Sequence, residues 1–90
     1  MLNIVSSNSF KRDLKLARKR GFDIQKLSDV VKMLASEKPL DERYKDHMLT
    51  GNYKGFRECH IEPDWLLVYR IEKDELELFL FRTGTHTDLF

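Results

Sequence analysis

The sequence has a single cysteine, Cys59, and none of the short spacings that usually accompany zinc binding. One cysteine cannot form a disulfide within the chain, and neither Cys-x-x-Cys nor His-x-x-x-His occurs. The three histidines are 13 and 26 residues apart, which matches no usual ligand spacing. We therefore expect a reduced chain without a metal or other cofactor, in which Cys59 is a small buried hydrophobe.

Long apolar runs are also absent. No stretch approaches the roughly 18 to 20 residues that a membrane-spanning helix needs. The first residues, MLNIVSSNSFKRD, lack the order of basic and then apolar residues that is typical of a signal peptide. We expect a protein without membrane contact that stays in the cytoplasm.

Ninety residues suffice for one core, so residues 1–90 are predicted to form a single domain.

The charge of the chain is balanced overall but not along its length. The net charge is +1, yet residues 1–40 have nine Lys and Arg against four acids, and residues 41–90 have seven against eleven. A dense basic segment suits a polyanionic partner. Its members are Lys11, Arg12, Lys15, Arg18, Lys19 and Arg20.

The first half of the chain predicts one strand and two helices. Residues 3–5 have the composition of a short strand. Apolar residues at helical spacing predict a helix from about Ser9 to Arg20 that ends at Gly21. The same period after Asp23 predicts a second helix, which Pro39 cannot continue. Because so few residues join the helices, we expect an antiparallel helical hairpin.

The second half predicts a loop and three strands. Residues 40–54 lose the period and include TGNYKG, so they should form a loop that can include a short strand. Strands are predicted at 55–61, 65–72 and 75–82, separated by EPD and the charged turn EKDE. These short connections favour hairpins. The expected fold is α+β, with the N-terminal helical hairpin packed on one face of a small antiparallel sheet.

Histidines and carboxylates occur close together in the second half. Histidine can give and take protons near neutral pH, although ordinary surface histidines would produce the same pattern. Arg82 stands where the leucine alternation of the last strand calls for an apolar residue, at a strand end where functional side chains often collect. The neighbours in sequence are Asp46 with His47, Asp64 with His60, and Asp88 with His86.

Such a set of side chains suits the cleavage of RNA. The RNA supplies its own nucleophile, because a base can remove the 2′-OH proton so that the oxygen attacks the adjacent phosphorus. An acid then protonates the leaving 5′ oxygen, and a cation stabilises the charge on the non-bridging oxygens. Aromatic side chains can hold a base by stacking.

Three stretches together form a specific pattern: the basic helical segment, YKDHMLTGNYKGFRECHIEPDWLLVYR, and RTGTHTDLF. Asp-His is followed about a dozen residues later by His-x-x-x-Asp-Trp, and then by Arg-x-Gly-x-His-x-x-Leu-Phe. In these motifs the chain resembles, over essentially its whole length, the RelE superfamily of bacterial toxins, and specifically its YafQ-type mRNA interferases. Met48 departs from the pattern, since relatives often have proline after Asp-His.

The resemblance implies the toxin of a type II toxin-antitoxin system. Such a toxin cleaves mRNA codons in the ribosomal A site without a metal, by 2′-OH attack that leaves a 2′,3′-cyclic phosphate. It implies His86 as general acid and either Asp64 or His60 as base. The other implied roles are phosphate positioning for His47, stabilisation of transition-state charge for Arg82, packing or stacking near the substrate for Trp65 and Phe90, and contact with ribosomal RNA for the basic residues 11–20.

The resemblance also implies partners. An antitoxin encoded beside the toxin would bind it, block the site and co-repress the operon, so that operator DNA is reached only through the antitoxin. Two other functions remain open from the sequence. One is a non-catalytic module that docks its basic helix on nucleic acid or a partner, with structural histidines. The other is a ParE-like gyrase inhibitor, against which the histidine set argues.

Overall fold

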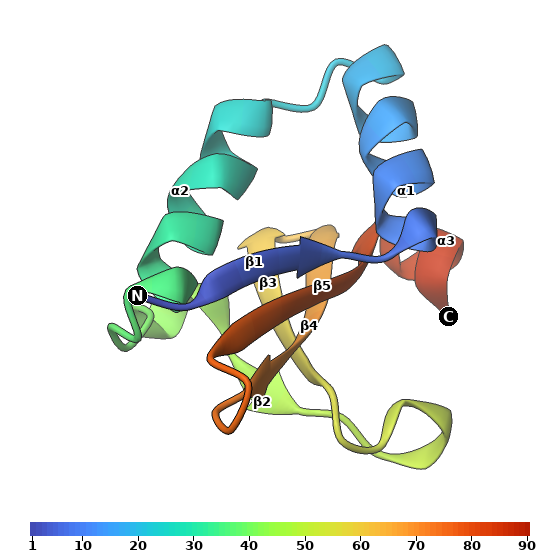
Figure 1. Cartoon of the computed structure of the whole chain (residues 1–90). Helices are drawn as coiled ribbons and strands as arrows, with labels where there is room; N and C mark the ends of the chain where they lie inside the picture. Colours follow the sequence, from blue (N-terminus) through green and yellow to red (C-terminus); the bar gives the residue numbers. More distant parts are fainter.

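A computed structural model describes residues 1–90 and has a five-stranded sheet with α1 and α2 on one face (Figure 1). The strand order is β1-β5-β4-β3-β2. The strands are β1 Asn3–Ser6, β2 His47–Met48, β3 Arg57–Glu62, β4 Trp65–Glu72 and β5 Glu77–Gly84. The helices are α1 Asn8–Lys19, α2 Ile24–Ala35 and the short α3 His86–Leu89, with 3-10 turns η1 Glu42–Tyr44 and η2 Gly51–Tyr53. The predicted α+β class is confirmed, and no helix has the length and apolar character needed to cross a membrane.

The sheet is mixed, which corrects the expectation of a purely antiparallel one. β3, β4 and β5 pair antiparallel, as the short connections predicted. β1 instead lies parallel to β5, with Asn3 opposite Glu77 and Ser6 opposite Leu80. Turn lengths determine the pairing only of neighbouring strands, and a strand that leads into helices has no such local signal.

Both long helices begin at a side-chain cap. Ser7 Oγ accepts a hydrogen bond from the Phe10 amide at the start of α1, and Asp23 caps α2 in the same way. The chain turns at Gly21, whose φ of 79° is in the left-handed region. The helices run in opposite directions but diverge from this turn, so α1 packs on β5 and α2 packs on β3 (Figure 1). The pair is therefore more open than a closely packed hairpin.

The last strand begins two residues later than predicted. Leu76, expected to face the core, lies in the preceding turn with φ of 54° and is 61% exposed. The strand gains residues at its other end and reaches Gly84. The loop before β3 includes β2, whose two residues pair with β3.

The two faces of the sheet have different surroundings. On the face toward α1 and α2, alternate residues such as Cys59, Leu67 and Leu80 join the main hydrophobic cluster. On the other face, Leu66 and Val68 form a smaller cluster with Leu89 of α3. Glu58 and His60 are paired with Val68 and Leu66, so they occupy the face without the long helices. Cys59 is fully buried, and burial raises the pKa of its thiol, so it is inert, as predicted.

Candidate active site

Three histidines from separate segments gather around one buried carboxylate. Glu58 of β3 is 5% exposed. Its Oε1 lies 3.4 Å from Nε2 of His60 and 3.7 Å from Nε2 of His47. The His60 ring is 6.3 Å from the His47 ring and 5.7 Å from the His86 ring, between centroids. The fold thus brings the three predicted histidines together.

Glu58 was not among the residues singled out from the sequence. Its signal is nevertheless present, because Glu58 and His60 are two residues apart in a strand and must share one face. Both residues lie opposite apolar residues of β4, since Glu58 pairs with Val68 and His60 pairs with Leu66. The carboxylate and the imidazole are therefore largely buried. Buried polar groups of this kind need partners, and the two imidazoles supply them.

Asp64 fixes the ring of His86, not that of His60, its neighbour in sequence. The Asp64 Oδ1 atom accepts a hydrogen bond from the His86 amide at 3.0 Å and from the His86 Nδ1 atom at 2.7 Å. These contacts, the backbone bond first, lower the pKa of Asp64. A carboxylate held in its charged form at Nδ1 leaves Nε2 of His86 free to carry a transferable proton.

The other two histidines also use Nδ1 for orientation. His47 Nδ1 lies 2.6 Å from the Lys45 carbonyl, and His60 Nδ1 lies 3.3 Å from the Pro63 carbonyl. A carbonyl oxygen can only accept, so each Nδ1 donates. Each Nε2 then faces the Glu58 carboxylate, at 3.7 Å for His47 and 3.4 Å for His60.

Asp46 holds the loop of His47 without touching the histidine. It accepts hydrogen bonds from the Tyr69 hydroxyl and from the Arg57 guanidinium, the latter at 3.2 Å. Burial, followed by the bond to Asp46, raises the pKa of Tyr69. Asp46 is therefore an anchor that ties β2 to the sheet, which fixes where His47 lies.

Arg82 lies in a groove between α1 and the end of β5. Its Nε donates to Asp13 Oδ2 at 2.6 Å, and the same carboxylate accepts from the Thr83 amide at 3.1 Å. This pairing, its hydrogen bond first, raises the pKa of Arg82. The β5 edge is free here because β1 pairs only as far as Leu80. Arg82 makes no hydrogen bond within the histidine cluster.

The short helix α3 is held by a network that reaches α1. Thr85 and Asp88 form a reciprocal capping box at its start. Asp88 also pairs with Arg20 at 2.6 Å, and this bond, more than any other contact, lowers the pKa of Asp88 to about 2. The glycine at position 84 leaves space for the Asp88 side chain, since a Cβ there would lie 2.9 Å from Asp88 Oδ2. Arg20 is therefore paired with Asp88, unlike a basic residue that is free to bind a phosphate.

The two aromatic residues predicted near the substrate, Phe90 and Trp65, differ in exposure. Phe90 is 59% exposed and meets the Tyr53 ring edge-on at 5.1 Å, so its ring is open to a ligand. Trp65 is 3% exposed, packs against Phe22 and donates from Nε1 to Thr83 at 2.9 Å. Of the two roles expected for Trp65, its burial fits packing and not stacking, because a ring enclosed in the core cannot stack on a substrate.

The basic residues of α1, and Arg20 directly after it, are all exposed. None is buried, since the apolar stripe of the helix takes Phe10 and Ala17. Asp13, the only acid among them, faces Arg82. The surface lies apart from the histidine cluster along the chain and is joined to it through Arg20 and Asp88.

The cluster also has the composition of a metal ligand set. One ligand atom each from Glu58, His60 and His86 lie within 4.8 Å of one another. Imidazole and carboxylate suit zinc and other first-row metals. Sequence spacing did not indicate this set, because its members come from β3 and α3 and meet only in the folded chain.

Comparison with known proteins identifies the class of protein to which the chain belongs. The matching family model, which spans residues 2–90, describes a bacterial toxin of a type II toxin-antitoxin system. The chain belongs to this family, the YafQ toxins, which confirms the resemblance seen in the motifs.

Similar relatives and structures cover nearly the whole chain. "mRNA interferase toxin YafQ" of Escherichia coli K12 is 45% identical over 89 residues, covering 98% of this chain and 95% of the relative. A metal-bound toxin from Helicobacter pylori has a TM-score of 0.94 and 54% identity, with all of both chains covered. The E. coli DinJ-YafQ complex has a TM-score of 0.90 and 43% identity, covering 100% of this chain and 99% of the other.

Proposed function

We propose that this protein is the toxin of a type II toxin-antitoxin pair and acts by cutting mRNA in the cytoplasm. The chain is an endoribonuclease of the mRNA interferase type, as the name of its E. coli relative indicates. The observation that carries the proposal is the cluster of Glu58, His60 and His86, with an acceptor and donors within reach of one another. RNA cleavage needs these two kinds of group and no external nucleophile.

The hydrogen bonds support a division of labour. His86 is the general acid, because Asp64 supports its ring at Nδ1 while Nε2 is free to protonate the leaving 5′ oxygen. Glu58 is the base, because it is the carboxylate at the centre of the cluster and, unlike Asp64, is not held by a hydrogen bond; its Oε1 lies 3.4 Å from Nε2 of His60 and 3.7 Å from Nε2 of His47. It takes the proton of the 2′-OH, the oxygen bonds to phosphorus, and a 2′,3′-cyclic phosphate forms as the 5′ oxygen leaves.

This assignment revises the roles expected from the sequence. Asp64 and His60 were the candidates for the base, but Asp64 is occupied by His86, and His60 has acceptors at both nitrogens. His47 and His60 are placed to stabilise the charge that develops on the phosphate. Arg82 would have to leave Asp13 to join them, so its predicted contribution is secondary.

The partners follow from the same proposal. In E. coli, YafQ forms a complex with DinJ. We propose an equivalent antitoxin for this chain, which covers the site and is the route to operator DNA. The exposed basic surface of α1 would contact ribosomal RNA, because Lys and Arg side chains bind phosphates through sequence-independent, salt-sensitive attraction.

The test is primer-extension mapping of a defined mRNA incubated with the pure protein. The mRNA is presented naked and on ribosomes paused with an empty A site, in both cases with and without a chelator. Cuts at A-site codons only on ribosomes, unaffected by the chelator, are the expected result. Absence of cuts in both settings, from folded protein, would favour the non-catalytic binding module. Cuts that require a metal would overturn the metal-independent mechanism.

A further inference from the structure

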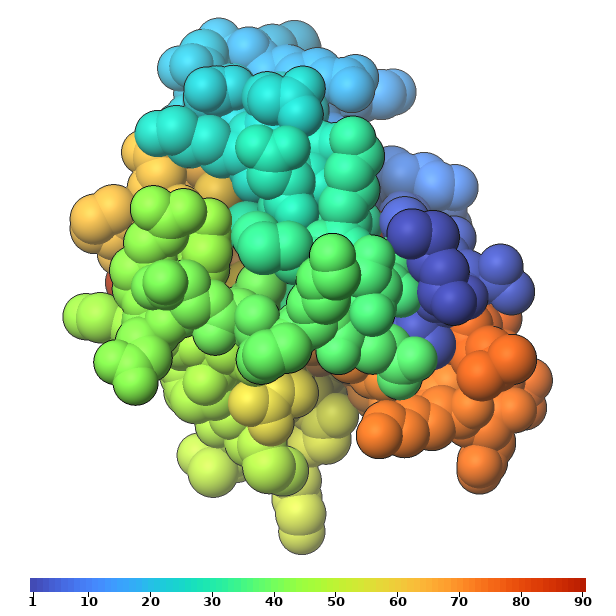
Figure 2. Space-filling view, turned by 90° about the vertical axis from the view of Figure 1, so that its left-hand side faces the viewer, coloured from blue at the N-terminus to red at the C-terminus, as the bar shows by residue number.

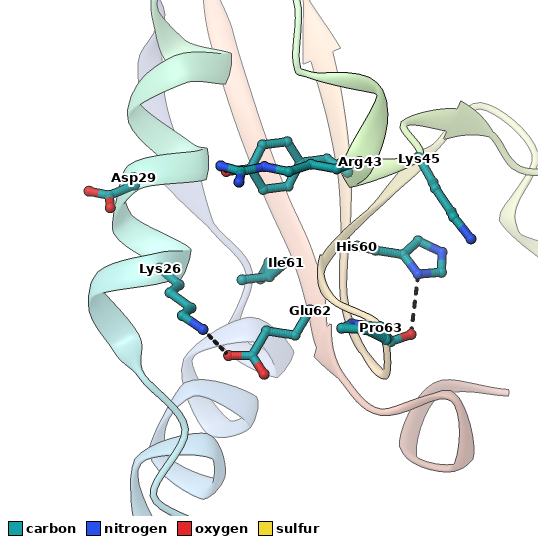
Figure 3. Close-up of a pocket in the computed structure, with 9 residues that line it drawn as sticks. Lys26, Asp29, Arg43, Lys45, His60, Ile61, Glu62 and Pro63 are labelled. Atoms are coloured by element: carbon teal, nitrogen blue, oxygen red, sulfur yellow. Dashed lines mark hydrogen bonds and ion pairs between the residues drawn. The ribbon is translucent and has the colours of Figure 1, made fainter.

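A cavity of about 530 Å³ lies between α2, η1 and the end of β3, beside the histidine cluster (Figure 3). Its volume falls in the range of ordinary small-molecule sites, roughly 300 to 1,000 Å³. In the space-filling view, the green segment that includes η1 lies beside α2 at this edge of the molecule (Figure 2). The residues that matter here are Lys26, Arg43, Tyr44, Lys45, His60 and Glu62.

The cavity is continuous with the proposed phosphate position. His60 is part of its wall, and its ring is 6.3 Å from that of His47. Lys45, also in the wall, accepts the Nδ1–H bond of His47 through its carbonyl. A strand of RNA with its scissile phosphate at the two imidazoles therefore has this cavity directly beside it.

The charges in the cavity favour a phosphate. Lys26 is neutralised by Glu62 at 2.9 Å, and Asp29 accepts a hydrogen bond from Gln25. Arg43 and Lys45 have no carboxylate partner and are both exposed. With Lys26, Arg43 and Lys45 against Asp29 and Glu62, the wall has a net charge of +1, and its unpaired cations, Arg43 and Lys45, belong to η1 and the residue after it.

The same wall offers a flat surface. The guanidinium carbon of Arg43 lies 4.8 Å from the centroid of the Tyr44 ring, and Arg43 donates to the Tyr44 hydroxyl at 2.8 Å. Tyr44 packs on the hydrophobic core, and Asp41 caps the turn through the Arg43 amide. The stacked pair is therefore fixed before any ligand arrives. Unpaired RNA bases stack on guanidinium planes and aromatic rings of this kind.

We propose that this cavity is a nucleotide subsite that binds the RNA residue next to the scissile phosphate. Its base stacks on the Arg43–Tyr44 pair, and its phosphate lies against Lys45. The subsite rests on the proposed function, since its place beside His47 and His60 gives it a role only when RNA is the substrate. It makes Arg43 and Tyr44 residues that determine which base is accepted beside the cut.

Binding can be measured without cleavage. Isotope-labelled protein is titrated with 2′-O-methyl trinucleotides of adenine and of uracil, which lack the nucleophile, and NMR signals are followed. We expect the signals of Tyr44, His47 and His60 to shift together in at least one titration. Arg43→Ala should weaken binding about tenfold, the size of one lost stacking contact. Arg43→Lys should not restore it, and the remote Lys73→Ala should bind as the wild type does.

Two results of the titration would overturn the subsite. One is a shift confined to the histidines, or no shift at all. The other is equal affinity of the wild type and Arg43→Ala.

Cleavage on ribosomes then separates the subsite from the proposed function. Arg43→Ala should raise KM or relax the base preference beside the cut, with kcat retained. If the wild type cuts and Arg43→Ala cuts with the same KM and preference, the subsite fails while the interferase stands. If the wild type cuts nothing but the trinucleotides still shift Tyr44, the interferase fails while the subsite stands.

Discussion

The two faces of the sheet are made by the same strands but carry different kinds of residue. Toward α1 and α2, β3 and β4 present Cys59, Leu67 and other apolar side chains that are almost completely buried. On the opposite face, the intervening positions present Glu58 and His60 beside a small apolar cluster. One face thus stabilises the fold, and the other carries the proposed catalytic residues. Because successive residues of a strand point to opposite faces, the two kinds of residue are neighbours in the sequence. Substitutions on the two faces should therefore have opposite consequences.

The largest effect is expected for His86→Ala. This change removes the proposed acid, so cleavage on ribosomes should fall by about 10² to 10⁴, the usual contribution of a positioned proton-transfer group. The His86 side chain is 54% exposed, so the free energy of unfolding should be almost unchanged. Primer extension and urea unfolding measure the two quantities. Activity close to that of the wild type would remove His86 from the mechanism.

Leu67→Ala tests the opposite face. Leu67 is fully buried, and truncation of a buried leucine costs about 2 to 5 kcal/mol through lost burial and the cavity left behind. Urea unfolding should show this loss, whereas the activity of the remaining folded protein should stay near that of the wild type. A variant that keeps its stability but loses activity would show that the two faces are not separated as described.

Tyr69→Phe examines the connection between the faces. Tyr69 packs on the helix side, but its hydroxyl donates to Asp46, which anchors the loop of His47. Loss of a hydrogen bond to a charged group should cost about 1.5 to 3 kcal/mol. We also expect a several-fold loss of cleavage, because His47 is then held less firmly. Unfolding and cleavage are measured on the same preparation, and a change in neither would refute the anchor.

The smallest effect concerns acid stability through Asp88. Its pKa in the folded protein is about 2, below the ordinary value of 3.8, so its ion pair stabilises the fold above about pH 4 and is lost as the pH falls toward 2. Asp88→Asn should therefore be less stable than the wild type at neutral pH, with a difference that narrows between pH 4 and 2. The exposed Asp74→Asn is the matched control. A difference independent of pH would exclude this ion pair as its cause.

The sequence predicted most of the fold because its main signals are local. Apolar periods, Gly21 and the short turns of the second half define the two helices and the antiparallel strands. The parallel pairing of β1 could not be predicted, since Asn3 and Glu77 meet only through the folded core. The start of β5 was missed because Leu76 continues the apolar alternation although its backbone belongs to the turn.

The sequence indicated which histidines belong to the candidate site, but it did not indicate the contacts that hold them. The motifs named the three histidines that the fold brings together. Nearness in the sequence did not indicate the contacts of the three carboxylates: Asp64 binds His86, Asp46 binds Tyr69 and Arg57, and Asp88 binds Arg20. Glu58 was not predicted, because only the two-residue period of β3, which places Glu58 and His60 on one face, indicates it.

The pairing of β1 with β5 also affects the order in which the molecule can assemble. β3, β4 and β5 are joined by short turns, so their hairpins close small loops, whereas β1 meets a partner 74 residues away. Distant contacts form slowly, because the chain between them must first be ordered. We therefore expect the hairpins, with Glu58 and His60, to form early and β1 to dock late. Pulsed hydrogen exchange during refolding should protect the amides of β4 before those of β1.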